Sequence, residues 1–207
     1  MSDVSRFGVF LPSYVWEGDG PERARGIKEF ARTVEDLGFD SLFITDHLLV
    51  GKRFYSVNWL EPLTTLAVAA GATERVRLGT SILIMPLRNP VILAKELATL
   101  QFLSEDRVIL GAGVGWNEVE YEAVGVKKSE RGKRTDEMLD IMMPLLEGET
   151  VTYHGQFYSV DDVSIEPRSG QRPLLWIGGG SQLASPKSPD LPKFVESVKA
   201  RTVKADG

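Results

Sequence analysis

The chain of 207 residues contains no cysteine and only two histidines, His47 and His154. Without cysteine it has no disulfides, thiolate metal ligands or cysteine nucleophiles, an absence that suits a reducing compartment. Two isolated histidines are too few for a zinc site, so we predict no metal. The start of the sequence lacks the basic and apolar stretches of a secretion signal, and no apolar run is long enough to cross a bilayer. We therefore expect a cytoplasmic protein that does not contact a membrane.

An excess of charge of one sign is also lacking, because 24 basic and 29 acidic residues leave a net charge of -5. No basic stripe with interleaved aromatic residues is present, so we do not expect nucleic acid as a partner. What the chain does have is an ordinary globular composition, with 43% hydrophobic residues and a mean hydropathy of -0.10. This is enough apolar material for one sizeable core, and we expect a single domain over residues 1–207.

Apolar runs that predict strands alternate with segments that predict helices. We expect strands at residues 6–11, 40–45, 75–85, 107–112 and 173–177, and helices at 21–37, 61–70, 89–103, 130–147 and 190–204. A tyrosine-rich segment, VTYHGQFYSVDDVSI at 151–165, alternates like a hairpin. Continuous apolar strands between helices are typical of a parallel sheet covered on both faces, which is either a barrel or an open sheet.

The segment RVILGAGVGWNEVEY, residues 107–121, carries the most unusual pattern. Glycine stands at alternate positions 111, 113 and 115, where it weakens a strand unless something approaches the main chain closely. A cofactor lying across the strand end is the explanation that we favour. A dinucleotide fingerprint does not fit, because Trp116 stands where its third glycine belongs and no strand-ending acid follows at the required distance. Ligands of parallel sheets bind at the carboxyl ends of the strands, so one shared site is expected there.

The chain contains, in order, ITDHL at 44–48, RVRLGTSILIMPLRNP at 75–90, RVILGAGVGWNEVEYEAVGV at 107–126, RGKRTDEML at 131–139, GQFYSV at 155–160 and PLLWIGGG at 173–180. In this series the six segments resemble the luciferase-like monooxygenase family. The resemblance implies an α/β fold, a (β/α)8 TIM barrel of which only the first five βα units are present. A complete barrel needs about 250 residues. We favour a truncated piece over a natural half-barrel that completes itself by association.

The resemblance also implies a site for a cofactor, either reduced flavin mononucleotide (FMN) or the deazaflavin coenzyme F-420. His47 is the implied catalytic residue, since the proton of histidine moves readily near neutral pH. Between Ser81 and Ile82 the family carries a non-proline cis peptide bond in a bulged strand. The implied cofactor contacts are Asp46, Ser81, Ile82, Ile84, Val114, Gly115, Glu120, Tyr121, Gly178, Gly179 and Gly180.

Most of these residues also have a purely structural explanation. In these alternatives Asp46 caps a turn, His47 is a packed side chain, and Ser81 and Ile82 belong to an ordinary buried strand. Glu120 and Tyr121 form a solvated helix start, and Gly178 to Gly180 form a plain turn. His154, in the hairpin segment, is expected at the surface without a role.

The implied activity is that of an oxidoreductase acting on a small organic substrate, in a full-length homo-oligomer. With reduced FMN it activates oxygen, and the resemblance allows a separate flavin reductase as partner; with F-420 it transfers a hydride. The sugar-phosphate dehydrogenases of the family carry an acid where this chain has Trp116, which disfavours that activity. The alternatives are a non-catalytic barrel fragment or flavin-storage protein, and an aldolase-like or phosphate-binding barrel, for which no lysine stands at a strand end.

Overall fold

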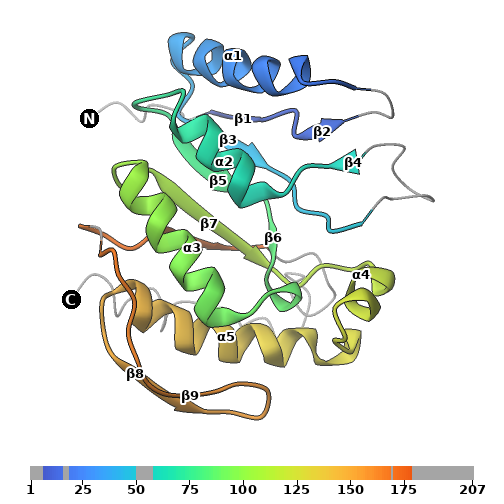
Figure 1. The fold of residues 1–207 in the computed structure, drawn as a ribbon, viewed down its shortest axis with the longest axis vertical. Helices are drawn as coiled ribbons and strands as arrows, with labels where there is room; N and C mark the ends of the chain where they lie inside the picture. Colours follow the sequence, from blue (N-terminus) through green and yellow to red (C-terminus); the bar gives the residue numbers. More distant parts are fainter. Residues whose placement is uncertain (1–6, 16–18, 50–57, 169, 179–207) are drawn as a thin grey trace, which may run out of the picture.

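The computed structural model describes residues 7–15, 19–49, 58–168 and 170–178. Its main sheet is parallel, with β1 (Gly8–Phe10), β3 (Ser41–Ile44), β5 (Arg77–Thr80), β7 (Val108–Gly113) and β10 (Leu174–Ile177) side by side in that order (Figure 1). A further short strand, β6 (Leu83–Ile84), also pairs with β7. Each strand therefore pairs with the next one along the chain. This order is typical of a β/α barrel, whereas an open doubly wound sheet reverses its order at a switch point.

Four longer helices follow strands of the sheet: α1 (Glu22–Asp36), α2 (Pro62–Ala70), α3 (Pro90–Leu103) and α5 (Arg131–Leu146). The predicted start signals are used, because Glu61 caps α2 through the N–H of Thr64 and Asn89 caps α3, each followed by proline at the first helical position. Figure 1 shows α2 and α3 lying over one face of the sheet. The side chains of Leu42, Ile44, Leu78, Val108 and Leu110 are buried in the core that these helices share with the sheet.

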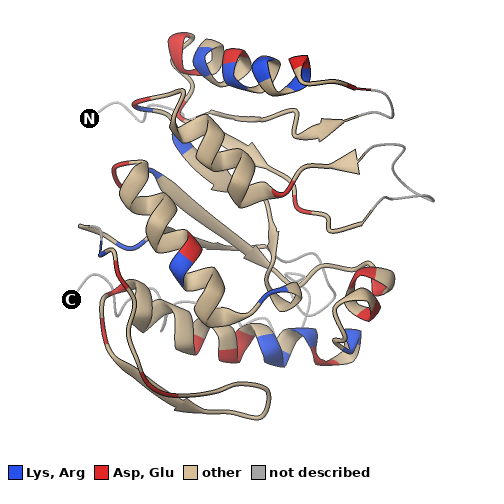
Figure 2. Ribbon diagram, in the orientation of Figure 1, with Lys and Arg blue, Asp and Glu red and all other residues tan. Residues whose placement is uncertain are grey.

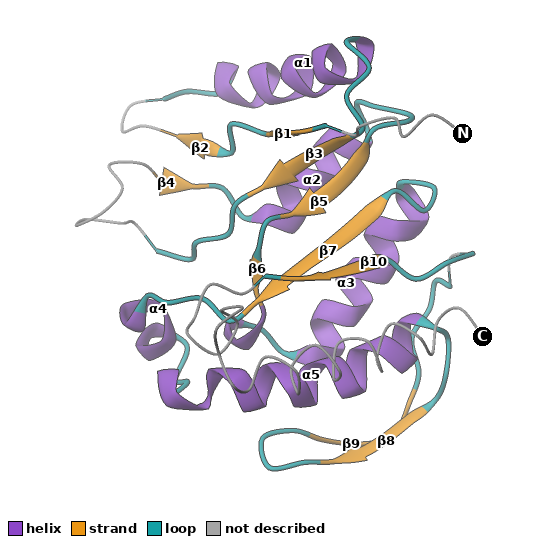
Figure 3. Ribbon diagram, turned by 180° about the vertical axis from the view of Figure 1, so that it is seen from behind, coloured by secondary structure: helices purple, strands orange, loops and turns teal. Residues whose placement is uncertain are grey.

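The opposite face of the sheet carries aromatic rings and glycines. The ring centroids of Phe10 and Phe43 are 6.2 Å apart, and those of Phe43 and Trp176 are 5.5 Å apart. Phe10 and Trp176 are about half exposed, and Gly79 leaves the room that the ring of Phe43 occupies. In Figure 3 this face is turned toward the viewer, with α2 and α3 behind it. In a complete barrel the face turned away from the helices is the packed interior.

Short elements complete the described chain. β2 (Tyr14–Val15) pairs with β4 (Asn58–Trp59) in an antiparallel ribbon, and neither strand is among those that we predicted. The six-residue helix α4 (Glu118–Ala123) is not among the helices that we predicted. The predicted hairpin is confirmed as β8 (Val151–His154) and β9 (Ser159–Val163), with His154 exposed on it. The 3-10 turns η1 (Met85–Leu87) and η2 (Lys128–Glu130) precede α3 and α5, and the helix predicted at 190–204 lies outside the described residues.

Charged residues are spread unevenly over the helices. They gather on α1, α4 and α5, whereas α2 has none and α3 has only Lys95 and Glu96 (Figure 2). Among the described helices, none is both long enough and apolar enough to cross a membrane. α2 and α3 are therefore the most apolar helices, whereas α1 and α5 combine exposed charged residues with residues buried in the core.

Candidate cofactor site

The strand predicted at 75–85 is interrupted near its end. β5 stops at Thr80, the peptide bond between Ser81 and Ile82 is cis, and β6 resumes the pairing with β7 at Leu83. Across the gap the Thr80 hydroxyl accepts the N–H of Gly111 at 3.0 Å and donates to the Gly111 carbonyl oxygen at 2.9 Å. A single uninterrupted strand is thus the wrong prediction here, and the cis bond in an irregular strand that the resemblance implied is present.

This interruption explains two of the three alternating glycines. A side chain at Gly111 would overlap the carbonyl oxygen of Thr80, and one at Gly113 would overlap the side chain of Ile82. The neighbouring strand therefore fills the space beside these two glycines, which accounts for them without a cofactor. That a cofactor lies across the strand end stays a prediction. Gly115 is different, because its φ of +68° lies in the left-handed region that favours glycine. A Cβ there would be 2.6 Å from Cγ2 of Ile84 and 3.1 Å from the hydroxyl of Tyr121.

His47 is held by a buried carboxylate. Its Nδ1 lies 3.3 Å and 3.4 Å from the two carboxylate oxygens of Glu120, on α4. The same carboxylate accepts the backbone N–H groups of Leu48 at 2.7 Å and Leu49 at 3.2 Å. Burial acts to raise the pKa of Glu120, but hydrogen bonds from His47, Leu49 and Leu48 together bring it below its ordinary value. At neutral pH Glu120 is therefore ionised and accepts a hydrogen bond from the Nδ1–H of His47, whose Nε2 lies on the opposite side of the ring.

Glu120 and Tyr121 are both only 1% exposed, so a solvated helix start does not describe them. Among the described residues, the Tyr121 hydroxyl and Nε of Arg131 are buried without a hydrogen-bond partner, and so is the hydroxyl of Ser13 after β1. Burial raises the pKa of Tyr121 to about 12, with the nearby Arg131 opposing the rise. Tyr121 is therefore a neutral donor at physiological pH. Buried donors without partners are rare in folded proteins, and a bound ligand is one explanation for them.

Asp46 lies at the carboxyl end of β3 and is almost fully buried. Its carboxylate receives Arg88 at both oxygens, at 2.6 Å and 3.1 Å, and the N–H of Ile84 at 2.8 Å. These bonds tie the end of β3 to β6 and to the turn before α3. The structural alternative, a cap of the following turn, gave Asp46 a structural role, which it has. Its carboxylate, however, binds Arg88 and the N–H of Ile84 on a neighbouring strand. Contact of Asp46 with a cofactor stays a prediction.

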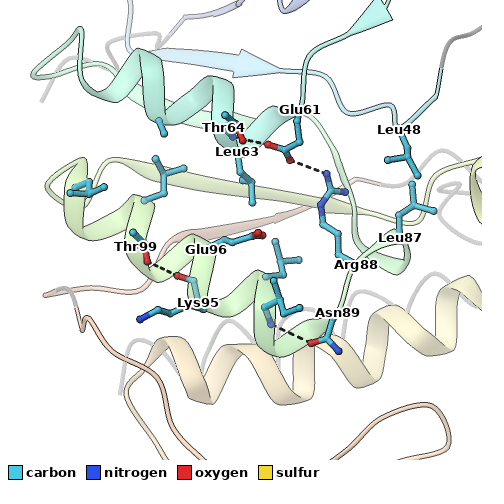
Figure 4. Close-up of a pocket in the computed structure, with 15 residues that line it drawn as sticks. Leu48, Glu61, Leu63, Thr64, Leu87, Arg88, Asn89, Lys95, Glu96 and Thr99 are labelled. Carbon is cyan, nitrogen blue, oxygen red and sulfur yellow. Dashed lines mark hydrogen bonds and ion pairs between the residues drawn. The ribbon is translucent and has the colours of Figure 1, made fainter. Parts of the chain in front are cut away.

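Arg88 also faces a hollow of about 570 Å³ between α2 and α3, on the helix side of the sheet (Figure 4). Its guanidinium lies 3.4 Å from Glu61, the cap of α2. Burial raises the pKa of Glu96 in the same hollow, and the charge of Glu61 adds to the rise. None of the predicted cofactor contacts lines this hollow. We therefore place the candidate site at the strand ends around His47.

Two aromatic rings contact His47, and a third packs against one of them. Its ring centroid is 5.9 Å from that of Trp59 and 6.0 Å from that of Trp116, and Trp59 makes an edge contact with Tyr14 at 5.9 Å. Tyr14 and Trp59 face each other in the β2–β4 ribbon. Figure 3 shows β2, β4 and α4 at the same end of the sheet as the strand tips. Our sequence reasoning missed Trp59 and Tyr14, because two-residue strands leave no periodic signal.

The structure thus brings most of the predicted residues together. His47 contacts Glu120, whose neighbour Tyr121 approaches Gly115 and Ile84, and Ile82 packs against both Gly113 and Gly178. Ser81 is exposed and Val114 is half-buried at the same strand ends. Gly179 and Gly180 lie outside the described residues. Arg88 and Arg131 were missed as site residues, although both stand inside segments that carried the resemblance.

Comparison with known proteins shows which family has this fold and these segments. The model of the luciferase-like monooxygenase family matches residues 5–185. An F-420-dependent glucose-6-phosphate dehydrogenase of Microbacterium testaceum (strain StLB037) is 36% identical over 188 residues, which cover 87% of this chain and 52% of that protein. The chain spans about half the length of the curated relatives that it matches.

Solved structures agree on the fold. An F-420-dependent secondary alcohol dehydrogenase in complex with an F-420–acetone adduct has a TM-score of 0.75 at 22% identity, over 95% of this chain and 64% of that one. The FMN complex of a type II Baeyer-Villiger monooxygenase, the oxygenating constituent of 3,6-diketocamphane monooxygenase from Pseudomonas putida, has a TM-score of 0.72 at 20% identity, over 86% of this chain and 54% of that one. The fold is therefore the predicted luciferase-like TIM barrel, present in part.

Proposed function

Because the chain belongs to the luciferase-like monooxygenase family, we propose that it is an F-420-dependent oxidoreductase that transfers a hydride to or from a small organic substrate. The observation that carries the proposal is the pairing of His47 with the buried carboxylate of Glu120 at the strand ends, 3.3 Å apart. The 36% identical relative is an F-420-dependent dehydrogenase by name, which favours the deazaflavin over FMN. Either cofactor fits the family.

The residues at the strand ends fit a flavin-type ring. Val114 and Gly115 are half-buried at the end of β7, and the cis bond between Ser81 and Ile82 lies on the adjacent strand. The hydroxyl of Tyr121 is a buried donor without a partner among the described residues. Ring carbonyl and phosphate oxygens are the acceptors that such donors require. When bound, the deazaflavin supplies a hydride donor or acceptor.

His47 is the residue that moves a proton in this proposal. Glu120 accepts a hydrogen bond from the Nδ1–H of His47 and thereby selects the tautomer and the orientation of the imidazole ring. The proton exchanged during the reaction is then carried at Nε2, on the side of the ring away from Glu120. The packing of His47 between Trp59 and Trp116 restricts the access of water to it.

The test is an absorbance titration of the protein with oxidised F-420 and, separately, with FMN. We expect saturable binding of F-420 and weak or no binding of FMN. His47→Ala should retain F-420 binding and lose hydride transfer, whereas His154→Ala, on the exposed hairpin, should change neither. Saturable binding of FMN alone would replace the proposal with the monooxygenase alternative. Binding of neither cofactor would refute both.

A further inference from the structure

Arg88 reaches the candidate site from the helix side of the sheet. It lies between η1 and α3, at the hollow between α2 and α3 (Figure 4). Only 18% of its side chain is exposed. Its guanidinium donates to both carboxylate oxygens of Asp46, to the carbonyl oxygen of Ile84 at 3.2 Å and to Glu61 at 3.4 Å. One side chain thus joins the end of β3, the strand β6 and the cap of α2.

Arg88 and Asp46 together hold both main-chain groups of Ile84. The N–H of Ile84 donates to Asp46 at 2.8 Å, and the carbonyl oxygen of Ile84 accepts from Arg88. Ile84 belongs to β6, which resumes the pairing with β7 after the cis bond, and its side chain lies beside Gly115. Asp46 directly precedes His47 in the chain. The ion pair therefore fixes the backbone next to His47 against a strand that carries predicted cofactor contacts.

The charges around His47 decide what the loss of Arg88 would do. Charged side chains come from three elements: Glu120 on α4, Asp46 after β3, and Arg131, which acts on the neighbouring Tyr121 from α5. The two indole rings that pack on the imidazole carry no charge. Asp46 is only 3% exposed, so water does not replace Arg88 as its partner. Without Arg88, the carboxylate of Asp46 would be a buried, unpaired negative charge next to His47, which favours the protonated imidazole.

We propose that Arg88 is a positioning residue of the cofactor site. It acts through Asp46, because it aligns the backbone at His47 with β6 and prevents the charge of Asp46 from stabilising the protonated form of His47. Its importance for hydride transfer rests on the proposed function, whereas its effect on His47 requires no cofactor. Arg88 bonds Asp46 from the side of the hollow, so its effect on the reaction is indirect.

NMR of the histidine ring signals as pH is varied tests this role without a cofactor. The chain has only two histidines, and His154 on the exposed hairpin gives an internal reference. In Arg88→Met the signals of His47 should titrate at a higher pH than in the unchanged protein, while those of His154 stay in place. The double variant Asp46→Asn/Arg88→Met removes the unpaired charge and should return the His47 signals to the pH of the unchanged protein.

Two further variants and a second measurement sharpen the test. Arg88→Lys keeps the positive charge but loses the two-pronged bond to Asp46, so its His47 signals should titrate between those of Arg88→Met and the unchanged protein. Lys95→Met removes another cation that lines the same hollow and is the matched control, which should leave the His47 signals unchanged. In an absorbance titration with F-420 we expect the affinity to fall about tenfold in Arg88→Met, because the strand ends lose their alignment.

The outcomes separate this proposal from the proposed function. A shift of the His47 signals in Arg88→Met that the double variant reverses supports the positioning role, even where F-420 does not bind and the proposed function fails. Signals of His47 that titrate at the same pH in the unchanged protein and in Arg88→Met, both folded by circular dichroism, would overturn the positioning role. Saturable F-420 binding would then leave the oxidoreductase proposal standing.

A shift that persists in the double variant, or that Lys95→Met reproduces, would also overturn the role, because it would not come from the charge of Asp46. Should Arg88→Met fail to fold, Arg88→Lys and the double variant decide in its place. The positioning role then requires that the His47 signals shift to higher pH in Arg88→Lys and return in the double variant, and equal titration in both would refute it.

Discussion

The two ends of the main sheet use the same device for different purposes. At the amino end, the carboxylate of Glu35 collects the backbone N–H groups of Glu74, Arg75 and Val76 at 2.6 to 3.1 Å. At the carboxyl end, the carboxylate of Glu120 collects two backbone N–H groups in the same way. Glu120 differs because it also holds the imidazole of His47. One carboxylate closes a loop, and the other closes a loop while orienting a reactive side chain.

The two ends of the sheet also differ in whether their buried hydrogen-bond donors have partners. At the amino end, all three nitrogens of the Arg107 guanidinium donate hydrogen bonds, to acceptors on Ala70, Thr73, Val76 and Ser104. At the carboxyl end, Tyr121 and Arg131 keep buried donors that have no partner among the described residues. Among the described residues, the arginine at the amino end is therefore fully hydrogen-bonded, whereas the carboxyl end keeps buried donors without partners, as we expect of an end that binds a ligand.

The largest expected effect is on stability, at the amino end. Arg107→Ala removes five hydrogen bonds and leaves half-buried carbonyl groups without donors, so we expect the free energy of unfolding to fall by about 3 kcal/mol. The dissociation constant for F-420 should not change. Urea unfolding and the absorbance titration measure the two quantities. Arg32→Ala, on the exposed side of α1, is the control. If Arg107→Ala weakened F-420 affinity and left stability unchanged, the amino end would not be the purely structural end.

The next effect is on the reaction, at the carboxyl end. Glu120→Gln keeps an acceptor for the backbone N–H groups but removes the negative charge beside His47. We expect the hydride-transfer rate to fall about 100-fold, in the range of general acid–base contributions, while F-420 still binds. The pH dependence of the rate should change shape, which a purely structural role would not cause. Glu118→Gln, exposed on the same helix, serves as the control. An unaltered pH profile in Glu120→Gln would make its carboxylate only a loop clamp.

The regular strands, helices and helix caps of the fold were predictable from the sequence. The five strands alternate with helices as the apolar runs predicted, and Glu61 and Asn89 cap the helices whose starts they marked. The cis bond between Ser81 and Ile82 came from the resemblance and not from local pattern. These features depend on residues close together in the chain or on a family motif, which is why sequence analysis could find them.

The contacts that make the site were not predictable. His47 and Glu120 are separated by 73 positions and Asp46 and Arg88 by 42, so no local periodicity links them. The strand predicted at 75–85 contains no proline that would mark a break, and its interruption depends on space left by Gly111 and Gly113 on the neighbouring strand. Long-range pairing and steric fit between strands decide these features, and a single sequence records neither directly.

A smaller effect on F-420 affinity is expected from Gly115→Ala. This variant separates the effect of backbone strain from the effect of a side chain that crowds the candidate site. Its φ of +68° disfavours alanine, at a cost of about 1 kcal/mol. The added methyl group would also press on Ile84 and the Tyr121 hydroxyl, so we expect F-420 affinity to fall about tenfold. Gly125→Ala is a matched control, because its φ is +71° with nothing within 4 Å of the new methyl group. Equal loss of F-420 affinity in both variants would assign the effect to backbone strain alone.

The smallest effect concerns pH and compares Glu35 with Glu96. Burial acts to raise the pKa of Glu35, but the N–H groups that it accepts lower it overall, so its stabilising contribution is present above the ordinary glutamate pKa and is lost as pH falls through the lowered value. The pKa of Glu96 is raised, chiefly by burial, so its contribution has the opposite sign: it is fully present below the ordinary pKa and is lost as pH rises through the raised value. Because solvent screens Glu35, Glu35→Gln should cost about 1 kcal/mol at pH 7 and less at pH 4. Glu96→Gln should leave stability at pH 7 unchanged or higher. Urea unfolding of both variants at the two pH values measures this, and a loss in Glu35→Gln that is the same at pH 4 as at pH 7 would show that its carboxylate charge does not hold the amino-end loop.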